Sequence, residues 1–223
     1  MLRAGFDYSW SEASFALADE NGTVIFDEFI QLPPRNASGL PSWMEECLKK
    51  HGAVFNDITE WSVGIGPGSF TGLRLASSFV MGLAFRRENV RCRGISTASA
   101  LAATAGLEAQ RVLALFDGRR DELLAFGLGN RNGSYEPDSF HAVLGKDSLN
   151  ALSDFEAFVC LAKDEAQIRR IAGGAVEENR NPVEHLKASK LILASPGDFN
   201  TTLKDLVYLR PAVFVEPRIP RQL

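Results

Sequence analysis

The sequence of 223 residues lacks several features that mark whole classes of protein. Its three cysteines, Cys47, Cys92 and Cys160, are odd in number, widely spaced and not in a Cys-x-x-Cys pair, so we expect reduced thiols rather than a disulfide framework. No stretch approaches the roughly 20 apolar residues that a membrane-spanning helix needs. The first residues also lack the long apolar core of a signal peptide. These absences predict a cytoplasmic protein without a membrane segment.

An excess of charge of one sign is also missing. The 24 Lys and Arg side chains nearly balance the 28 Asp and Glu side chains, which gives a formal net charge of −4. Residues 1–112 and 113–223 each carry a net charge of −2. Proteins that bind nucleic acid on their own usually present a strongly positive face, so strong independent binding of nucleic acid is not expected. The 45% apolar content is ordinary and is enough for one or two packed domains.

Histidine is scarce as well. His51, His141 and His185 are separated by far more than one helical turn, so the chain has no His-x-x-x-His pair to hold a metal ion on a helix. We expect each histidine to be a surface or packing residue. The sequence therefore predicts no metal site and no catalytic residue.

One module occurs twice along the chain, as a strand that ends in Asp, a turn, a second strand and an Asn-Gly pair. Asp7 and Asp117 are 110 residues apart, and the Asn-Gly pairs at 21–22 and 132–133 are 111 residues apart. Asn-Gly between two strand-like segments is typical of a β-hairpin. A repeated supersecondary unit indicates a duplicated architecture. We therefore predict two lobes, residues 1–106 and 107–223.

The first lobe is expected to have the element order β-β-β-α-β-α-β-α. Two α/β lobes that each open with an Asp-bearing turn resemble the actin/hexokinase/Hsp70 (ASKHA) fold, in which such turns flank the phosphate chain of ATP. The fold class we predict is α/β and two-lobed, with duplicated β-β-β-α-β-α lobes. The expected strands are 2–8, 13–18, 23–31, 61–65, 91–95, 110–117, 122–127 and 157–162, followed by an extended segment at 209–215. The expected helices are 38–51, 73–87, 96–105, 164–172, 182–188 and 198–207.

A glycine-rich loop, Gly64–Arg74, joins a buried strand to a helix. Two interpretations remain open for it. Ser69 or Thr71 can cap the following helix, whose first N–H groups attract anions, so the loop can be a phosphate or carboxylate site. It can also be a tight, capped strand-to-helix turn, which we favour because no Lys precedes the Ser/Thr as in a Walker loop.

The helix that follows is apolar nearly all round. Between Leu73 and Phe85 only Arg74, Ser77 and Ser78 are polar, so both sides of the helix need to be covered. Either the rest of the chain or another protein covers the second side, and the pattern favours neither. Met81 is an adaptable contact residue, and the small residues allow close approach of another helix.

The loop carries the strongest resemblance to a known family. Its sequence Gly-Pro-Gly-Ser-Phe-Thr-Gly-Leu-Arg at 66–74 resembles the signature of the TsaB (YeaZ) family. Weaker similarities at 7–9, 117–120 and 207–210 extend the resemblance over almost the whole chain. The signature residues are Gly66, Pro67, Gly68, Ser69, Phe70, Thr71, Gly72 and Arg74.

The resemblance implies a non-catalytic partner subunit of the tRNA N6-adenosine(37) threonylcarbamoyltransferase complex. In that family the TsaD paralogue binds ATP and metal and forms threonylcarbamoyladenosine (t6A), and the ATPase TsaE joins the pair. It implies contact with tRNA only through the complex, and a homodimer when the subunit is isolated. It also places the interface with TsaD on the helices at 38–51 and 73–87. The interface residues expected here are Met44, Leu48, Ser77, Ser78, Met81 and Phe85.

Asp7 and Asp117 are expected to mark vestigial phosphate turns, in which each Asp side chain hydrogen-bonds within its own turn. Tyr8 and Trp10 are bulky where a phosphate turn needs Gly, so we expect no cofactor. Two alternatives stay open. One is an ATP-dependent kinase or ATPase of the same fold, and the other is a peptidase with Ser69 as nucleophile, for which the sequence offers no neighbouring base.

Overall fold

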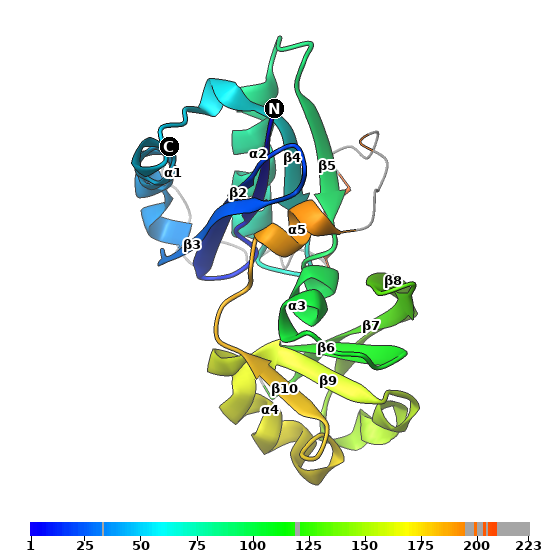
Figure 1. The fold of residues 1–223 in the computed structure, drawn as a ribbon. Coiled ribbons are helices and arrows are strands. Elements are labelled where there is room, and N and C mark those ends of the chain that lie inside the picture. Colours follow the sequence, from blue (N-terminus) through cyan, green and yellow to red (C-terminus); the bar gives the residue numbers. More distant parts are fainter. Residues whose placement is uncertain (33, 119–120, 195–198, 200–202, 204, 209–223) are drawn as a thin grey trace, which may run out of the picture.

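The structure is a computed structural model that describes residues 1–32, 34–118, 121–194, 199, 203 and 205–208. It contains two five-stranded mixed sheets, each in a lobe of its own, with helices packed on them (Figure 1). None of the helices in the described part is long and apolar enough to cross a membrane.

The first sheet has the strand order β3-β2-β1-β4-β5. Strand β1 pairs antiparallel with β2 and parallel with β4, and β4 pairs parallel with β5. The β2–β3 hairpin turns at Asn21-Gly22, where Gly22 has a φ of +85°, a conformation that glycine adopts easily. Its strands are β1 (Leu2–Asp7), β2 (Glu12–Ala18), β3 (Val24–Gln31), β4 (Ile58–Gly64) and β5 (Arg91–Ile95).

The second sheet repeats this plan with the order β10-β9-β6-β7-β8. Reversed, it matches the first sheet strand for strand, so β1 corresponds to β6 and Asp7 to Asp117. The two-lobed α/β fold is therefore confirmed. At the β7–β8 turn both Asn132 (φ +53°) and Gly133 (φ +85°) have the positive φ values of a type I′ hairpin. Its strands are β6 (Arg111–Asp117), β7 (Leu123–Arg131), β8 (Ser134–Leu144), β9 (Ala157–Leu161) and β10 (Arg180–Val183).

Helix α3 lies between the lobes (Figure 1). One face of it enters a core shared by both sheets, in which Ala98 and Leu101 pack with Ala16 of β2 and Val159 of β9. Helices α1 and α2 complete the core of the first lobe, and α4 that of the second. The helices are α1 (Leu40–Lys50), α2 (Phe70–Ala84), α3 (Thr97–Ala105), α4 (Glu165–Ala172) and α5 (Ser189–Leu193).

The predicted element order of the first 106 residues is confirmed, but two expectations for the second half are wrong. Residues 182–188 are not a helix, because Arg180–Val183 forms β10 and α5 begins only at Ser189. Strand β8 was not expected, since Pro137 and Asp138 interrupt its pattern. Both β8 and β10 are edge strands, where proline is tolerated because one row of N–H groups needs no partner.

The last expected elements cannot be compared in full. Most of the helix expected at 198–207, and the extended segment at 209–215, lie outside the described residues. The described residues 205–208 have no regular secondary structure.

The chain returns to the first lobe after β10. Helix α5 packs on β1, β2 and β4 (Figure 1), and a Cβ built on Gly5 would lie 2.1 Å from the carbonyl oxygen of Ala188, so only glycine fits there. Further on, Val207 N donates to the carbonyl oxygen of Ile65 at 2.8 Å. The boundary near residue 107 thus lies between the two sheets in the sequence, but the segment that follows β10 packs against the first sheet.

Arg93 of β5 holds α5 in place. Its side chain is 1% exposed, and its Nε donates to Ser62 Oγ at 2.8 Å. Its Nη2 donates to the carbonyl oxygens of Leu191 and Ile192 at 3.2 and 2.8 Å. The last carbonyls of a helix have no partner within the helix and carry partial negative charge, so a buried guanidinium satisfies them well.

We predict that Arg93→Met lowers the free energy of unfolding by about 3 kcal/mol, because several buried acceptors lose a charged donor at once. Urea denaturation measures the loss. The matched control is Arg131→Met, whose side chain is 74% exposed and which should cost less than about 0.5 kcal/mol. Equal effects of the two substitutions would show that Arg93 does not anchor α5.

Candidate functional site

The glycine-rich loop packs directly on the turn between β1 and β2. A Cβ on Gly72 would lie 2.0 Å from the carbonyl oxygen of Tyr8, and one on Gly68 would lie 2.6 Å from that of Ser9. Ser69 caps α2, because its Oγ accepts from Gly72 N at 3.3 Å. These contacts agree with a tight, capped strand-to-helix turn. The glycines of the signature loop allow close approach of the chain to itself.

Asp7 is the centre of a buried hydrogen-bond cluster behind this loop. It is 3% exposed, and its carboxylate accepts from Ser9 N at 2.8 Å, Ser9 Oγ at 2.9 Å and Thr97 Oγ1 at 2.7 Å. Thr97 Oγ1 in turn accepts from Gly66 N at 3.1 Å. Burial raises the pKa of Asp7 above its ordinary value, against the lowering effect of these hydrogen bonds. Asp7 thus stabilises its own turn, the glycine-rich loop and the start of α3.

An aromatic pair joins the first Asp-bearing turn to strand β6 of the second lobe. Trp10, from the first turn, stacks on Phe116 at the end of β6, with ring centroids 5.0 Å apart and an interplanar angle of 16°. Lys163 Nζ donates to Ser11 Oγ at 3.2 Å and bridges the lobes beside this pair. The two bulky side chains in the first Asp-bearing turn, Tyr8 and Trp10, do not fit a turn that closely approaches a phosphate chain, for which glycine is suited.

One side of α2 faces away from the lobe. Its large apolar members Phe70, Met81 and Phe85 are 41%, 42% and 71% exposed. They recur at helical spacing with exposed small or polar residues between them. Among the described residues outside α2, Tyr208 lies with its ring 5.2 Å from that of Phe70, and the Arg86 guanidinium lies 5.3 Å from the centroid of the Phe85 ring. We call this surface the α2 face, and its members are Phe70, Thr71, Arg74, Ser78, Met81, Gly82 and Phe85.

The opposite side of α2 is covered by the chain itself. Leu73, Ala76 and Val80 are fully buried, and Ser77 Oγ donates to the carbonyl oxygen of Leu203. Among the described residues, the helix is thus covered by its own chain on one side, whereas the large apolar side chains of the α2 face on the other side remain exposed.

Three of the six expected interface residues are not accessible. Met44 and Leu48 are fully buried in the core of the first lobe, and Ser77 is 5% exposed beneath Leu203. A partner cannot reach them while the lobe is folded, so we correct the interface prediction at these positions. Ser78, Met81 and Phe85 lie on the α2 face and remain candidates.

Two of the histidines stack on aromatic rings, and His185 Nδ1 also lies 2.8 Å from a carboxylate oxygen of Glu12. His51 stacks on Phe26 at 4.8 Å between ring centroids, and His185 stacks on Phe29 at 3.5 Å. Burial raises the pKa of Cys160 to about 12, which keeps it a thiol at neutral pH. Across the part of the chain that the structure describes, no three His, Cys, Asp or Glu side chains are grouped to hold a metal ion.

Known proteins resemble this chain in both sequence and fold. The family model of TsaD, the tRNA N6-adenosine threonylcarbamoyltransferase, matches residues 35–138. The tRNA threonylcarbamoyladenosine biosynthesis protein TsaB of Escherichia coli (strain K12) is 32% identical over 127 residues, which cover 56% of this chain and 54% of that protein. The match thus spans about half the length of this relative.

Three solved structures share the fold. A Pseudomonas aeruginosa protein with similarity to peptidase YEAZ has a TM-score of 0.74 at 23% identity, covering 94% of this chain and 99% of its own. YeaZ from Pseudomonas aeruginosa has a TM-score of 0.67 at 24% identity, covering 86% and 88%. The polyphosphate/ATP-glucomannokinase of Arthrobacter sp. strain KM has a TM-score of 0.50 at 13% identity, covering 85% and 95%.

The repeated sheets, with α3 between them, define a two-lobed α/β fold of the actin/hexokinase-like type. The chain is similar in sequence to TsaB over about half its length, and its fold is that of the YeaZ structures. The sequence drew attention to Trp10 only as a bulky residue. Its partner Phe116 was missed, because a stacking contact between residues 106 positions apart leaves no local pattern.

We predict that Gly72→Ala lowers the free energy of unfolding by about 2 kcal/mol, because the new methyl group overlaps the carbonyl of Tyr8. Gly82→Ala is the matched control in the same helix, since its Cβ meets nothing within 4 Å, and it should stabilise by about 0.5–1 kcal/mol. Thermal and urea unfolding of both variants measure the difference. A neutral Gly72→Ala would contradict the close approach of loop and turn.

Proposed function

We propose that this chain is a non-catalytic subunit of the cytoplasmic complex that makes t6A at position 37 of tRNA. Its partner is the catalytic TsaD paralogue, with the ATPase TsaE joining them and tRNA bound through the complex. The observation that carries the proposal is the open α2 face, which starts within the signature loop and exposes Phe70, Met81 and Phe85.

The corresponding helix of the other lobe supports this interpretation of the α2 face. Helix α4 lies between β9 and β10 as α2 lies between β4 and β5, yet its outer side is charged. Arg169 pairs with Glu165 at 3.5 Å and with Glu177 at 3.2 Å, and Arg170 pairs with Asp121. The fold therefore does not require an apolar outer face at this position, and a protein partner explains the one on α2.

Two features support a non-catalytic role. The first Asp-bearing turn carries the bulky Trp10, which stacks on Phe116, and the sequence has no helical histidine pair for a metal. A net charge of −4 fits a subunit that meets tRNA together with partners. Without TsaD, the α2 face buries itself against a second copy, because leaving it in water is unfavourable.

We predict that Met81→Glu combined with Phe85→Glu abolishes copurification with the TsaD paralogue, because two charges would be buried against an apolar partner. The matched control is Val143→Glu on β8, since Val143 is exposed to a similar extent (39%) as Met81 (42%). Size-exclusion chromatography with light scattering measures both the complex and the homodimer. Unchanged assembly of the double variant, with an intact circular dichroism spectrum, would contradict the assignment of the α2 face.

We further predict that depletion of this protein removes t6A from tRNA, measured by mass spectrometry of tRNA nucleosides. Wild-type protein and Val143→Glu should restore the nucleoside, whereas the double variant should not. Normal t6A after depletion would refute the proposal. Tight binding of Mg-ATP to the isolated chain in calorimetry would instead favour the kinase or ATPase alternative.

A further inference from the structure

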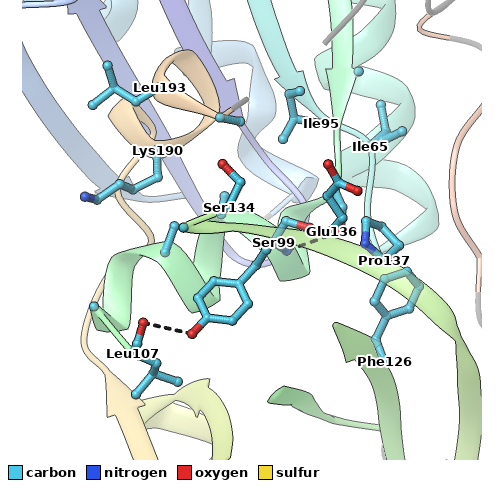
Figure 2. Close-up of a pocket in the computed structure, with 18 of the residues that line it drawn as sticks. Ile65, Ile95, Ser99, Leu107, Phe126, Ser134, Glu136, Pro137, Lys190 and Leu193 are labelled. Carbon is cyan, nitrogen blue, oxygen red and sulfur yellow. Dashed lines mark hydrogen bonds between the residues drawn. The ribbon is translucent and has the colours of Figure 1, made fainter. Parts of the chain in front are cut away.

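A pocket of about 720 Å³ lies between the two lobes, on the side of β5 and β8. The end of β5, helices α3 and α5, and the β7–β8 hairpin line it, so both sheets contribute edge strands to its walls (Figure 2). The Asp-bearing turns and the Trp10–Phe116 stack do not belong to its lining. The pocket is therefore separate from the region where the superfamily binds ATP.

The walls of this pocket are mostly apolar. Ile65 and Ile95 come from the first lobe, and Phe126 and Pro137 from the second. Pockets of this size with apolar walls and a few polar groups are typical of small-molecule sites. An occupant would present apolar surface to both lobes at once.

The polar groups of the lining define the chemistry of the occupant. Figure 2 shows the carboxylate of Glu136 directed toward the side where Ile65 and Ile95 lie, whereas the ammonium group of Lys190 points away from these residues. Glu108 adds a second acidic group to the lining. Arg131 approaches Glu136 at 3.3 Å, but its side chain is 74% exposed, so this pair is weak in water. The carboxylate of Glu136 is thus available to a cation.

Ser99 gives a second indication that the pocket binds a molecule. It is 7% exposed, lines the pocket at the first turn of α3, and its Oγ has no hydrogen-bond partner among the residues that the structure describes. Buried hydroxyl groups in folded proteins are nearly always paired. A bound molecule with a polar atom near this wall would satisfy the hydroxyl.

We propose that this inter-lobe pocket binds a small, mainly apolar molecule that carries a protonated amine. The apolar body lies between Ile65, Ile95 and Phe126, and the amine is held by the carboxylate of Glu136. The same apolar body with a carboxylate in place of the amine would bring like charges together and is disfavoured.

The test compares two probes with the same ring system, naphthylmethylamine and naphthylacetic acid, on the full-length chain by isothermal titration calorimetry and protein-observed NMR. We expect the amine to bind about tenfold more tightly than the acid, as one charge-assisted contact provides. Glu136→Gln should remove this tenfold difference. The matched control Glu178→Gln removes an exposed carboxylate outside the lining and should preserve it.

Two filling variants show where the probe binds. Ala103→Phe from α3 and Ser134→Phe from β8 place a ring in the pocket from opposite lobes, and each should abolish binding while the protein stays folded by circular dichroism. If neither probe binds at about 1 mM, the proposal is refuted. Binding that survives both filling variants, or an amine preference that survives Glu136→Gln, would refute it equally. None of these outcomes bears on assembly through the α2 face.

Discussion

The buried carboxylate of Asp7 is the constraint on which most of the first lobe depends. A charged or polar group removed from water is tolerated only when its hydrogen bonds are replaced, and here Ser9 and Thr97 supply three donors. Through Thr97 the cluster also fixes the N–H of Gly66. One side chain therefore sets the β1–β2 turn, the start of the signature loop and the first residue of α3.

From this cluster the geometry of the α2 face follows. The loop can close on the turn only because Gly68 and Gly72 leave room for the carbonyls of Ser9 and Tyr8. That approach fixes where α2 begins, and hence which of its residues face the sheet. Leu73, Ala76 and Val80 then face the core, while Met81 and Phe85 are left outside. The positions of the signature glycines and of the α2 face are thus two consequences of one packing arrangement.

The sequence predicted those features whose signal is local. The Asn-Gly turns and the strand that ends in Asp marked the duplication, and the β-β-β-α-β-α-β-α order followed from periodicity. The family resemblance led to the wrong assignment of Met44 and Leu48 to an interface, and the sequence pattern could not correct it, because an apolar helix stripe looks alike whether it faces its own core or a partner. Ser77 was misassigned because its cover, Leu203, lies 126 residues further along the chain. Strands β8 and β10 were not predicted, because each contains a proline, which looks like a strand breaker in the sequence but is tolerated at a sheet edge.

The return of the chain to the first lobe explains why a pocket persists between two otherwise packed lobes. Arg93 binds the carbonyl end of α5 and holds that helix on the first sheet, so Lys190 and Leu193 form a wall beside the gap rather than filling it. Trp10 of the first lobe stacks on Phe116 of the second, and neither residue lines this pocket. The pocket thus stays open on the side lined by β5 and β8. A molecule bound on that open side would contact α3 and both sheets together, and so would favour one relative orientation of the lobes.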